Sequence, residues 1–453
     1  MKGPRVRKAR PWLPVAFVMG TLASATSAAQ TTRGAGGATR GVDSGTIIYE
    51  ASGIRVIQRF ATTSEIVVAN LYLLGGVRQV TAENAGLELL LLEASERGTK
   101  TYSQDRLRRS KARLGTRILT SARADWTSIG MQATRATFDS TWKIFTSRVT
   151  EPVLDSAGVE IVRAQLLTAV RQRQDSPDAL VEFLADSFAF AGHAYALPPA
   201  GTERSLARIT AAELRRYHSE QFVKSRMLLV VVGNVPRSKI EQLVQQSLGR
   251  LGAGSYRWAL PDTLPRSRAT VLTVNRPLPT NYILGLYAGP PAGSKDYQAL
   301  RVAAAVLAGQ FFGEVRSRRN LTYAVDAPFM ERAIGSGGLY VTTSSPDLTL
   351  DVMRRELEAL KGGLVDARAL ERLVQQFFTQ YFLDNESAAT QADLLARAQL
   401  YRGDFRTMER FMDDLHSITP DDIRRAAQRY MRDVKFVFIG EASRAPIRTM
   451  ERF

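Results

Sequence analysis

Apolar residues recur along this chain with two different periods, which predicts strands followed by helices. The strand-like runs are β-branched and partly alternate with polar residues, and they cover 46–49, 53–58 and 66–73, with two more ending near Ala133. The helix-like runs repeat apolar residues every three to four positions, and they cover 84–96, 102–114, 138–149, 156–173 and 177–190. This order of elements predicts an α+β fold.

Two distant segments are built alike, which indicates an internal repeat. Residues 209–235 and 418–442 each begin with a Thr at a helix N-cap, continue with acids in the first turn and an Arg-Arg pair, and end in an apolar strand closed by Gly. Their offset is about 209 residues. We interpret them as parts of two copies of one module, although a chance likeness between two helix–strand units is the alternative.

The first residues resemble an export signal. Five Lys and Arg precede an apolar stretch, residues 12–23, and small residues follow it to Ala29. The apolar stretch is too short for a transmembrane helix, so we expect a secretory signal peptide over 1–29, a flexible leader over 30–44 and no transmembrane segment after cleavage. An exported chain without any Cys cannot form disulfides or use a thiol, and a bacterial periplasm fits best.

The formal charge of +17 does not by itself indicate which class of partner the chain binds. The signal peptide holds five positive charges and no acid, so the rest of the chain carries about +12. No nucleic-acid motif accompanies this charge, and we do not expect nucleic acid binding. Attraction to an anionic membrane surface or to an acidic partner stays open.

Residues 86–99 read G-L-E-L-L-L-L-E-A-S-E-R-G-T and carry the main functional signal. Their frame resembles the metal-binding helix of the pitrilysin/insulinase metallopeptidases, the inverted zincins, whose motif is H-x-x-E-H. The resemblance places the first His at Leu89, the catalytic Glu at Leu92 and the second His at Glu93. The family's third ligand, a Glu, falls near Ala169. All four positions are degenerate.

The side chains of Leu and Ala supply no lone pair, and the single carboxylate of Glu93 is no metal site, so we expect no metal and no catalytic residue in this chain. Its three His, at 193, 218 and 416, lie at no ligand spacing from one another. The alternative is a buried apolar helix over 86–96 with Glu88, Glu93 and Glu96 toward water. A peptidase with a relocated metal site is a weaker possibility.

The resemblance extends over most of residues 46–445. His193-Ala-Tyr195 followed by Gly201 is similar to the family's H-P-Y…G stretch, in which the His is structural, and Asp175-Ser-Pro177 matches a family turn. The resemblance implies an α+β fold of two homologous modules, each a mainly antiparallel sheet packed with helices on one face. We expect modules at 45–251 and 269–445, a Gly- and Pro-containing linker at 252–268 and a C-terminal tail at 446–453.

One part of the family's site persists in the second module. Residues 314–325 resemble the segment R-x-x-x-G-L-x-Y-x-V, with Asn320 in place of the Gly. In active members this Arg and Tyr face the zinc across the cavity and help to hold the substrate, so the resemblance assigns substrate binding to Arg316 and Tyr323. A guanidinium and a phenol can donate hydrogen bonds to a peptide carbonyl. The alternative is an Arg that caps or pairs and a half-buried Tyr.

A lost zinc helix beside a retained Arg/Tyr pair resembles the metal-free subunit of two-subunit processing peptidases. The resemblance implies a non-catalytic subunit of an exported zinc metallopeptidase heterodimer, which closes the peptide chamber and positions a peptide or unfolded polypeptide. Its partner would be a homologous subunit that carries H-x-x-E-H and holds the Zn. The alternative is a family-derived scaffold or peptide-binding protein without a peptidase partner.

Overall fold

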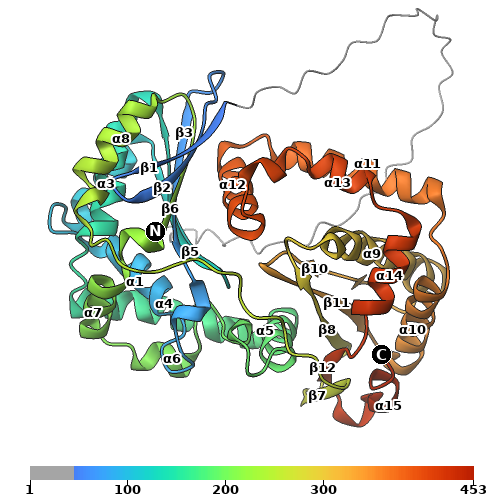
Figure 1. The fold of residues 1–453 in the computed structure, drawn as a ribbon. Helices are drawn as coiled ribbons and strands as arrows, with labels where there is room; N and C mark the ends of the chain where they lie inside the picture. Colours follow the sequence, from blue (N-terminus) through green and yellow to red (C-terminus); the bar gives the residue numbers. More distant parts are fainter. Residues whose placement is uncertain (1–44) are drawn as a thin grey trace, which may run out of the picture. The chain divides into compact units, whose positions relative to one another are not determined.

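The computed structural model describes residues 45–453, and the predicted signal peptide and leader lie outside the described residues. Within that range, fifteen α-helices accompany two mixed sheets of six strands each (Figure 1). The predicted α+β class with two modules is therefore confirmed. In the described part of the chain, no helix is long and apolar enough to cross a membrane.

The first module is built on a sheet with the strand order β1-β2-β6-β3-β5-β4. Its strands are β1 (Thr46–Ala51), β2 (Ile54–Arg59), β3 (Ile66–Leu74), β4 (Arg117–Ala122), β5 (Trp126–Thr134) and β6 (Met227–Val232). Its helices are α1 (Leu87–Ala94), α2 (Gln104–Leu114), α3 (Phe138–Thr150), α4 (Ser156–Asp175), α5 (Pro177–Ala189), α6 (Glu203–Arg208), α7 (Ala211–Gln221) and α8 (Arg237–Gln246). All strand pairs are antiparallel except β2 with β6.

The second module is built on the strand order β10-β11-β8-β12-β7, with β9 also paired to β11. Its strands are β7 (Thr270–Asn275), β8 (Asn281–Pro291), β9 (Val325–Asp326), β10 (Phe329–Met330), β11 (Ile334–Thr343) and β12 (Lys435–Gly440). Its helices are α9 (Lys295–Phe311), α10 (Pro346–Gly362), α11 (Ala367–Asp384), α12 (Ala388–Arg402), α13 (Phe411–His416), α14 (Pro420–Tyr430) and α15 (Ile447–Met450).

The two sheets share one central topology. The run β2-β6-β3-β5 corresponds to β7-β12-β8-β11, and in both runs the first pair is parallel and the other two are antiparallel. The helix–strand pairs predicted from the repeat are α7 with β6 and α14 with β12. Thr210 and Thr419 cap these helices by accepting hydrogen bonds from the backbone N–H of Glu213 and Asp422. The internal repeat is thus confirmed.

Each module also covers the second face of the other module's sheet. Helix α12 packs its Ala392, Leu395 and Ala396 with Val68 and Val230 of the first sheet. In return α5 packs against β8 and β12 of the second sheet, through residues such as Val181 and Ala185 (Figure 1). Within each module the helices cover one face of the sheet, as expected. That a helix of the other module covers the second face was not predicted from the sequence. This cover explains why β6 reads M-L-L-V-V-V, since a strand buried on both faces is apolar throughout.

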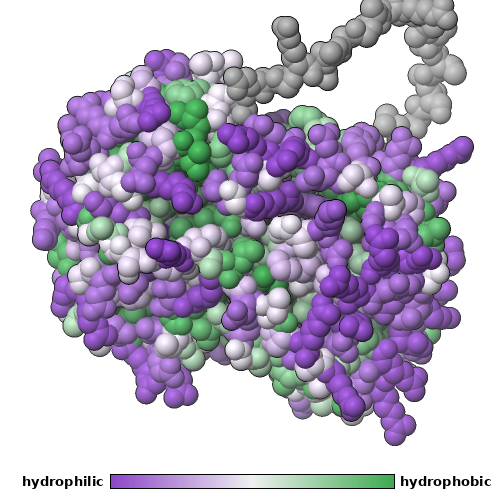
Figure 2. Space-filling view, in the orientation of Figure 1, coloured by the Kyte–Doolittle hydropathy of each residue, from purple (hydrophilic) through white to green (hydrophobic). Residues whose placement is uncertain are grey.

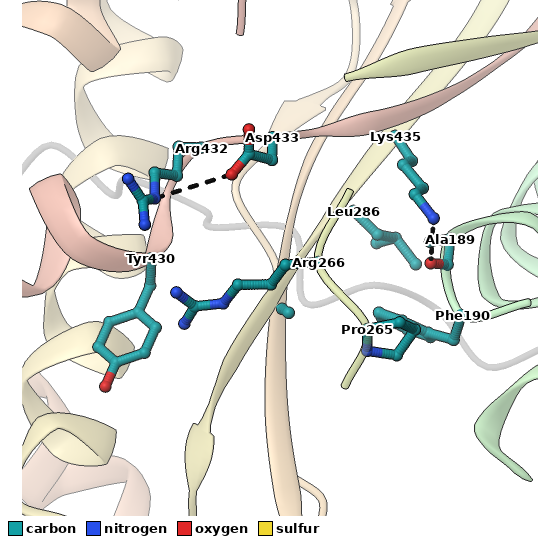
Figure 3. A pocket seen from close by; sticks show the side chains of 10 residues that line it. Ala189, Phe190, Pro265, Arg266, Leu286, Tyr430, Arg432, Asp433 and Lys435 are labelled. Atoms are coloured by element: carbon teal, nitrogen blue, oxygen red, sulfur yellow. Dashed lines mark hydrogen bonds and ion pairs between the residues drawn. The ribbon is translucent and has the colours of Figure 1, made fainter. Parts of the chain in front are cut away.

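The residues at the end of α5 meet the second sheet at a narrow seam, whose lining side chains are drawn in Figure 3. Phe190 and Pro265 face Leu286, and Lys435 donates from Nζ to the carbonyl of Ala189 at 3.1 Å. The remaining space is about 10 Å³, close to what a single water needs. This seam is therefore packing and not a ligand site.

A buried carboxylate, Asp125, joins the two modules. Its Oδ1 accepts a hydrogen bond from the phenol of Tyr195 at 2.6 Å, and its Oδ2 accepts one from the phenol of Tyr401 at 2.8 Å. The backbone N–H of Ala333 donates to Oδ2 at 3.0 Å. Burial and the nearby carboxylate raise the pKa of both phenols far above the usual range, so both remain protonated donors. Tyr401 and Ala333 belong to the second module, so the contact fastens one module to the other.

The segment that connects the two modules packs against the rest of the structure, and so do the C-terminal residues. Residues 252–268 form no helix or strand, and Trp258 donates from Nε1 to the carbonyl of Leu400 at 2.8 Å. Residues 446–453, expected as a tail, include α15, and the ring of Phe453 packs against Phe436. Hydrophilic side chains cover most of the face shown in Figure 2, and hydrophobic ones form small separate patches.

We expect Tyr401→Phe to lower the free energy of unfolding by about 1–3 kcal/mol, because the buried Asp125 loses one of its hydrogen-bond donors. Tyr323→Phe is the control, since that phenol is 84% exposed and should change stability very little. Urea unfolding of both variants checks this, and equal midpoints would contradict the joining role of Asp125.

Candidate functional site

Helix α1 occupies the place of the metal-binding helix and is held by close packing at its start. Gly86, its N-cap, has φ 89°, and a Cβ there would lie 2.9 Å from backbone atoms of Ala200 and Gly201. The side chain of Leu92, at the catalytic Glu position, is 1% exposed, and Leu89 is half-buried. The helix is therefore a core element at the position where the family places its general base.

The C-terminal end of α1 is closed by an arginine. Arg148 of α3 donates from Nη2 to the carbonyl of Leu92 at 2.8 Å and from Nε to the hydroxyl of Ser95 at 3.0 Å. Its Nη1 lies 3.3 Å from a carboxylate oxygen of Glu96. This fully buried guanidinium binds one of the carbonyls at the end of the helix, and its charge is placed at the negative end of the helix dipole.

Glu88 corrects the expectation that the three glutamates of this segment face water. It is 4% exposed and lies 2.8 Å from Nη2 of Arg226, which comes from the segment before β6. The phenol of Tyr217 and the hydroxyl of Thr127 also donate to it, at 2.6 and 2.5 Å. Glu88 instead ties α1 to the sheet and to α7, because a buried carboxylate needs a cation and hydrogen-bond donors. Glu93 and Glu96 are half-buried.

A hollow of about 240 Å³ lies beside the position of the second His. Glu93 lines it and accepts a hydrogen bond from Thr120 of β4. Helix α4 contributes Val162 and Gln165 to the wall. Ala169, where the third ligand was expected, is exposed and lies one helical turn beyond Gln165. The polar α4 residue that reaches the hollow is therefore Gln165.

The residues present do not fit a zinc ion. Leu89 and Leu92 offer no donor atom, Glu93 already binds Thr120, and Gln165 is an amide. Among residues 45–453 no group of three His, Cys, Asp or Glu side chains could hold a metal ion. The donor chemistry of this site thus does not suit a metal ion at α1.

The three histidines make structural contacts in three separate places. His193 accepts from the N–H of Tyr195 at Nδ1, and its Nε2 lies 3.1 Å from the carbonyl of Asp262. His218 places Nε2 2.7 Å from the carbonyl of Val149, and burial lowers its pKa below the usual value. The ring of His416 packs edge-on against Phe378. Within residues 45–453, none of the three belongs to a group that could hold a metal ion.

In the second module, α9 passes into a π-helical segment, Phe312–Arg318, which carries Arg316. Asn320 follows with φ 51°, in the left-handed region where the family has Gly. Asn tolerates this region better than most residues, so the substitution preserves the turn. The turn brings the chain back and leaves Tyr323 outside the helix.

The structure brings Arg316 and Tyr323 together on the surface. The guanidinium carbon lies 5.0 Å from the centre of the Tyr323 ring and 5.1 Å from that of Phe312. Tyr323 is 84% exposed and Arg316 is exposed as well. Within the described part of the chain Arg316 makes no ion pair, whereas its neighbours Arg318 and Arg319 both pair with Glu314. The donors of Arg316 and the phenol of Tyr323 are thus available to a ligand.

Two residues around α1, Gln165 and Glu88, could not be identified from the spacing of the metal-binding motif. Gln165 stands one turn before the expected ligand position, and only the packing of α4 on α1 shows which turn faces the hollow. One sequence feature could have indicated that Glu88 is buried. It directly follows Gly86-Leu87 and precedes four leucines, so its neighbours in the sequence are mostly apolar.

Comparisons with known proteins agree with this geometry. A family model described as "Peptidase M16 inactive domain" matches residues 208–377. The chain is 20% identical over 408 residues to the "Uncharacterized zinc protease YmxG" of Bacillus subtilis, which covers 87% of this chain and 98% of that protein. It is 21% identical over 430 residues to "Cytochrome b-c1 complex subunit 1, mitochondrial" of Caenorhabditis elegans, covering 87% and 88%.

A solved structure of a peptidase M16 inactive domain from Pseudomonas fluorescens has the same fold, with a TM-score of 0.81 at 18% identity, covering 88% of this chain and 98% of that one. Together these matches agree with the resemblance of this chain to peptidases of the pitrilysin/insulinase type, and the family model and the solved structure are both described as inactive domains.

We expect the purified protein to contain no stoichiometric zinc, because the four ligand and catalytic positions lack a donor set. Elemental analysis checks the metal content directly. A chelator should leave the thermal midpoint unchanged, and a fall of several degrees would reveal a structural metal that these residues do not account for.

We expect Glu88→Gln to lower the free energy of unfolding by about 3–5 kcal/mol, because it leaves the charge of Arg226 buried without its partner. Glu241→Gln is the matched control, since its pair with Arg237 is exposed and should contribute about 1 kcal/mol or less. Denaturant unfolding of both variants gives the comparison. Equal losses would mean that Glu88 does not anchor α1.

Proposed function

We propose that this chain is the metal-free subunit of an exported zinc metallopeptidase heterodimer. Its partner is a homologous subunit with H-x-x-E-H, which holds the Zn and carries out hydrolysis. The observation that carries this proposal is the contrast between the two modules. In the first, α1 is packed and tied down by Glu88 and Arg148, whereas in the second Arg316 and Tyr323 remain exposed with free donors.

The exposed pair is suited to holding a peptide carbonyl. The ring of Tyr323 supports the guanidinium of Arg316 by a cation–π contact and leaves the N–H groups free to donate. A guanidinium and a phenol placed together can hold a carbonyl oxygen and stabilise the negative charge that develops on it during hydrolysis. The chain would therefore supply positioning and charge stabilisation, while the partner supplies the metal-bound water. Closing the two subunits around the peptide would exclude bulk solvent.

The second candidate is a scaffold or peptide-binding protein without a peptidase partner. The likeness to a subunit of the Caenorhabditis elegans cytochrome b-c1 complex favours it, because that relative's name describes a component of an assembly and not a protease. A scaffold would need no free Arg316 and Tyr323. Their contribution to peptide hydrolysis therefore separates the two candidates.

We expect Arg316→Ala to lower the peptidase activity of this chain mixed with its H-x-x-E-H-bearing homologue by about a hundredfold, and Tyr323→Phe by about tenfold, because each removes a donor from the transition state. Arg318→Ala is the matched control, since Arg318 stands on the same π-helical segment and pairs with Glu314. Hydrolysis of a fluorogenic peptide measures the effect.

Copurification tests the partnership itself. A tagged form of this chain should retain the homologue through gel filtration, and the mixture should cleave peptides faster than the homologue alone. If the mixture gains nothing, or if Arg318→Ala lowers activity as much as Arg316→Ala, the proposed role is wrong and the scaffold is favoured.

A further inference from the structure

A row of arginines runs along the exposed side of α2, away from the hollow beside α1. Arg106, Arg109 and Arg113 stand at positions i, i+3 and i+7, so their side chains leave the helix on one side, and all three are exposed. Leu107, the buried residue of α2, and Arg108, which lines the hollow, point in other directions. We call the three exposed side chains the arginine stripe.

The arginine stripe has no counter-charge in the structure. Within residues 45–453 none of its guanidinium groups forms an ion pair or a hydrogen bond. Asp105, the acid of α2, pairs instead with Arg108 at 3.2 Å. Glu96, in the segment between α1 and α2, pairs with Lys111 and, at 3.3 Å, with Arg148. The three positive charges therefore remain available to an anion that is not part of residues 45–453.

The placement of these charges opposes the stability of α2. Arg106 and Arg109 stand three residues apart, Arg113 follows four residues later, and like charges at these spacings repel on a helix. Arg106 also lies in the first turn, at the positive end of the helix dipole, where a cation is unfavourable. The ring of Tyr102 holds it there, with the guanidinium carbon 5.0 Å from the ring centre. An arrangement that lowers the stability of the helix and neutralises no acid of the fold indicates an anionic partner.

The exposed side of α2 suits an extended anionic surface better than it suits a protein. Protein interfaces are usually anchored by aromatic side chains that fill buried pockets, and their centres are depleted of charged residues. Helix α2 offers no such anchor, because Leu107 is buried, Leu114 is half-buried and its remaining residues are polar, charged or Ala. Long side chains with a fixed positive charge match the phosphates of lipid head groups.

We propose that the arginine stripe docks this chain on a bilayer surface that contains anionic phospholipids. Lys100, which is exposed and unpaired within the described residues and stands just before α2, adds a fourth positive charge. The guanidinium groups donate hydrogen bonds to lipid phosphates, and the fold stays outside the hydrocarbon. A secretory route, as expected from residues 1–29, brings the chain next to such a bilayer. Docking uses neither Arg316 nor a peptidase partner, so its failure is distinguishable from failure of the proposed subunit role.

Co-sedimentation with phospholipid vesicles tests the docking. The chain from Gln30 is used, the form expected after signal cleavage, because residues 1–29 carry five cations and an apolar stretch of their own. We expect it to bind vesicles of equal parts phosphatidylglycerol and phosphatidylcholine at low salt, and to leave them at about 1 M salt, where charges are screened beyond about 3 Å. Vesicles of phosphatidylcholine alone should bind far less. No binding to the anionic vesicles, or binding that salt does not weaken, would overturn the proposal.

Removal of the stripe gives the second test. Replacing Arg106, Arg109 and Arg113 together by Gln should weaken binding to the anionic vesicles by about a hundredfold, because each cation near such a surface contributes about fivefold. The thermal midpoint should stay equal or rise, since the repulsion within α2 is removed. Undiminished binding by this folded variant would show that the stripe is not the docking surface.

A second triple variant separates the stripe from the overall charge. It removes the same number of positive charges from exposed arginines on β2, α11 and α15 that make no ion pair within the described residues, namely Arg55, Arg368 and Arg448, each replaced by Gln. This control should bind the anionic vesicles within about fivefold of the unmodified chain. Equal weakening in the two triple variants would mean that binding follows net charge alone, and the stripe would lose its assigned role.

Poly-L-glutamate distinguishes a lipid surface from an acidic protein. Tighter stripe-dependent binding to the vesicles than to poly-L-glutamate, compared at equal concentrations of negative charge, supports docking on lipid. Tighter stripe-dependent binding to poly-L-glutamate would assign the stripe to an acidic protein and contradict the membrane proposal.

Discussion

The contact between Asp125 and two tyrosines from different modules is the constraint on which the rest of this structure depends. A carboxylate removed from water needs donors, and Asp125 obtains them from Tyr195, Tyr401 and the N–H of Ala333. Separating the modules would leave the charge buried with fewer donors or expose the apolar residues that α5 and α12 cover on the opposite sheets. The exchange of helices and the buried carboxylate therefore act together. They hold the two modules as one body and fix where α1 and Arg316 stand within it.

Helix α1 has a structural role in this arrangement. Its metal-binding and catalytic positions hold other residues, but the helix itself is well packed. The position of the general base is filled by a buried Leu92, whose carbonyl is bound by Arg148, and the preceding turn is tied to the sheet through Glu88 and Arg226. A buried ion pair contributes little net stability, but removing one member is costly, so Glu88 and Arg226 fix the placement of α1 more than they stabilise the fold. The segment that resembles a metal site is thus held at both ends by buried side chains.

Much of the fold was predictable because it depends on local pattern. The period of apolar residues located the helices and strands, and the two Thr-capped helices followed by apolar strands revealed the repeat, whose copies α7–β6 and α14–β12 are confirmed. What failed depends on contacts between residues far apart. Glu88 looked like a surface acid because Arg226, its partner, stands 138 positions away. The cover that α5 and α12 give to the opposite sheets leaves no periodic signal at all. Ala169 is exposed, whereas Gln165, one helical turn earlier, reaches the hollow beside α1. Which of the two turns faces the hollow depends on how α4 packs.

The asymmetry between the modules is the physical argument for a shared site. Tyr323 is 84% exposed, so it buries little area and contributes little to stability. Arg316 makes no ion pair within the described residues, so no such contact of the fold depends on it. The fold would accept other residues at both positions, as it has accepted Leu at 89 and 92. Yet Asn320 keeps the left-handed turn that places the two side chains face to face at 5.0 Å. A pair that the fold does not require, but whose geometry the turn preserves, is best explained by a ligand that both side chains contact. The hydrogen-bond donors of this pair suit a peptide carbonyl, and in the proposed heterodimer the metal that cleaves the peptide belongs to the other chain.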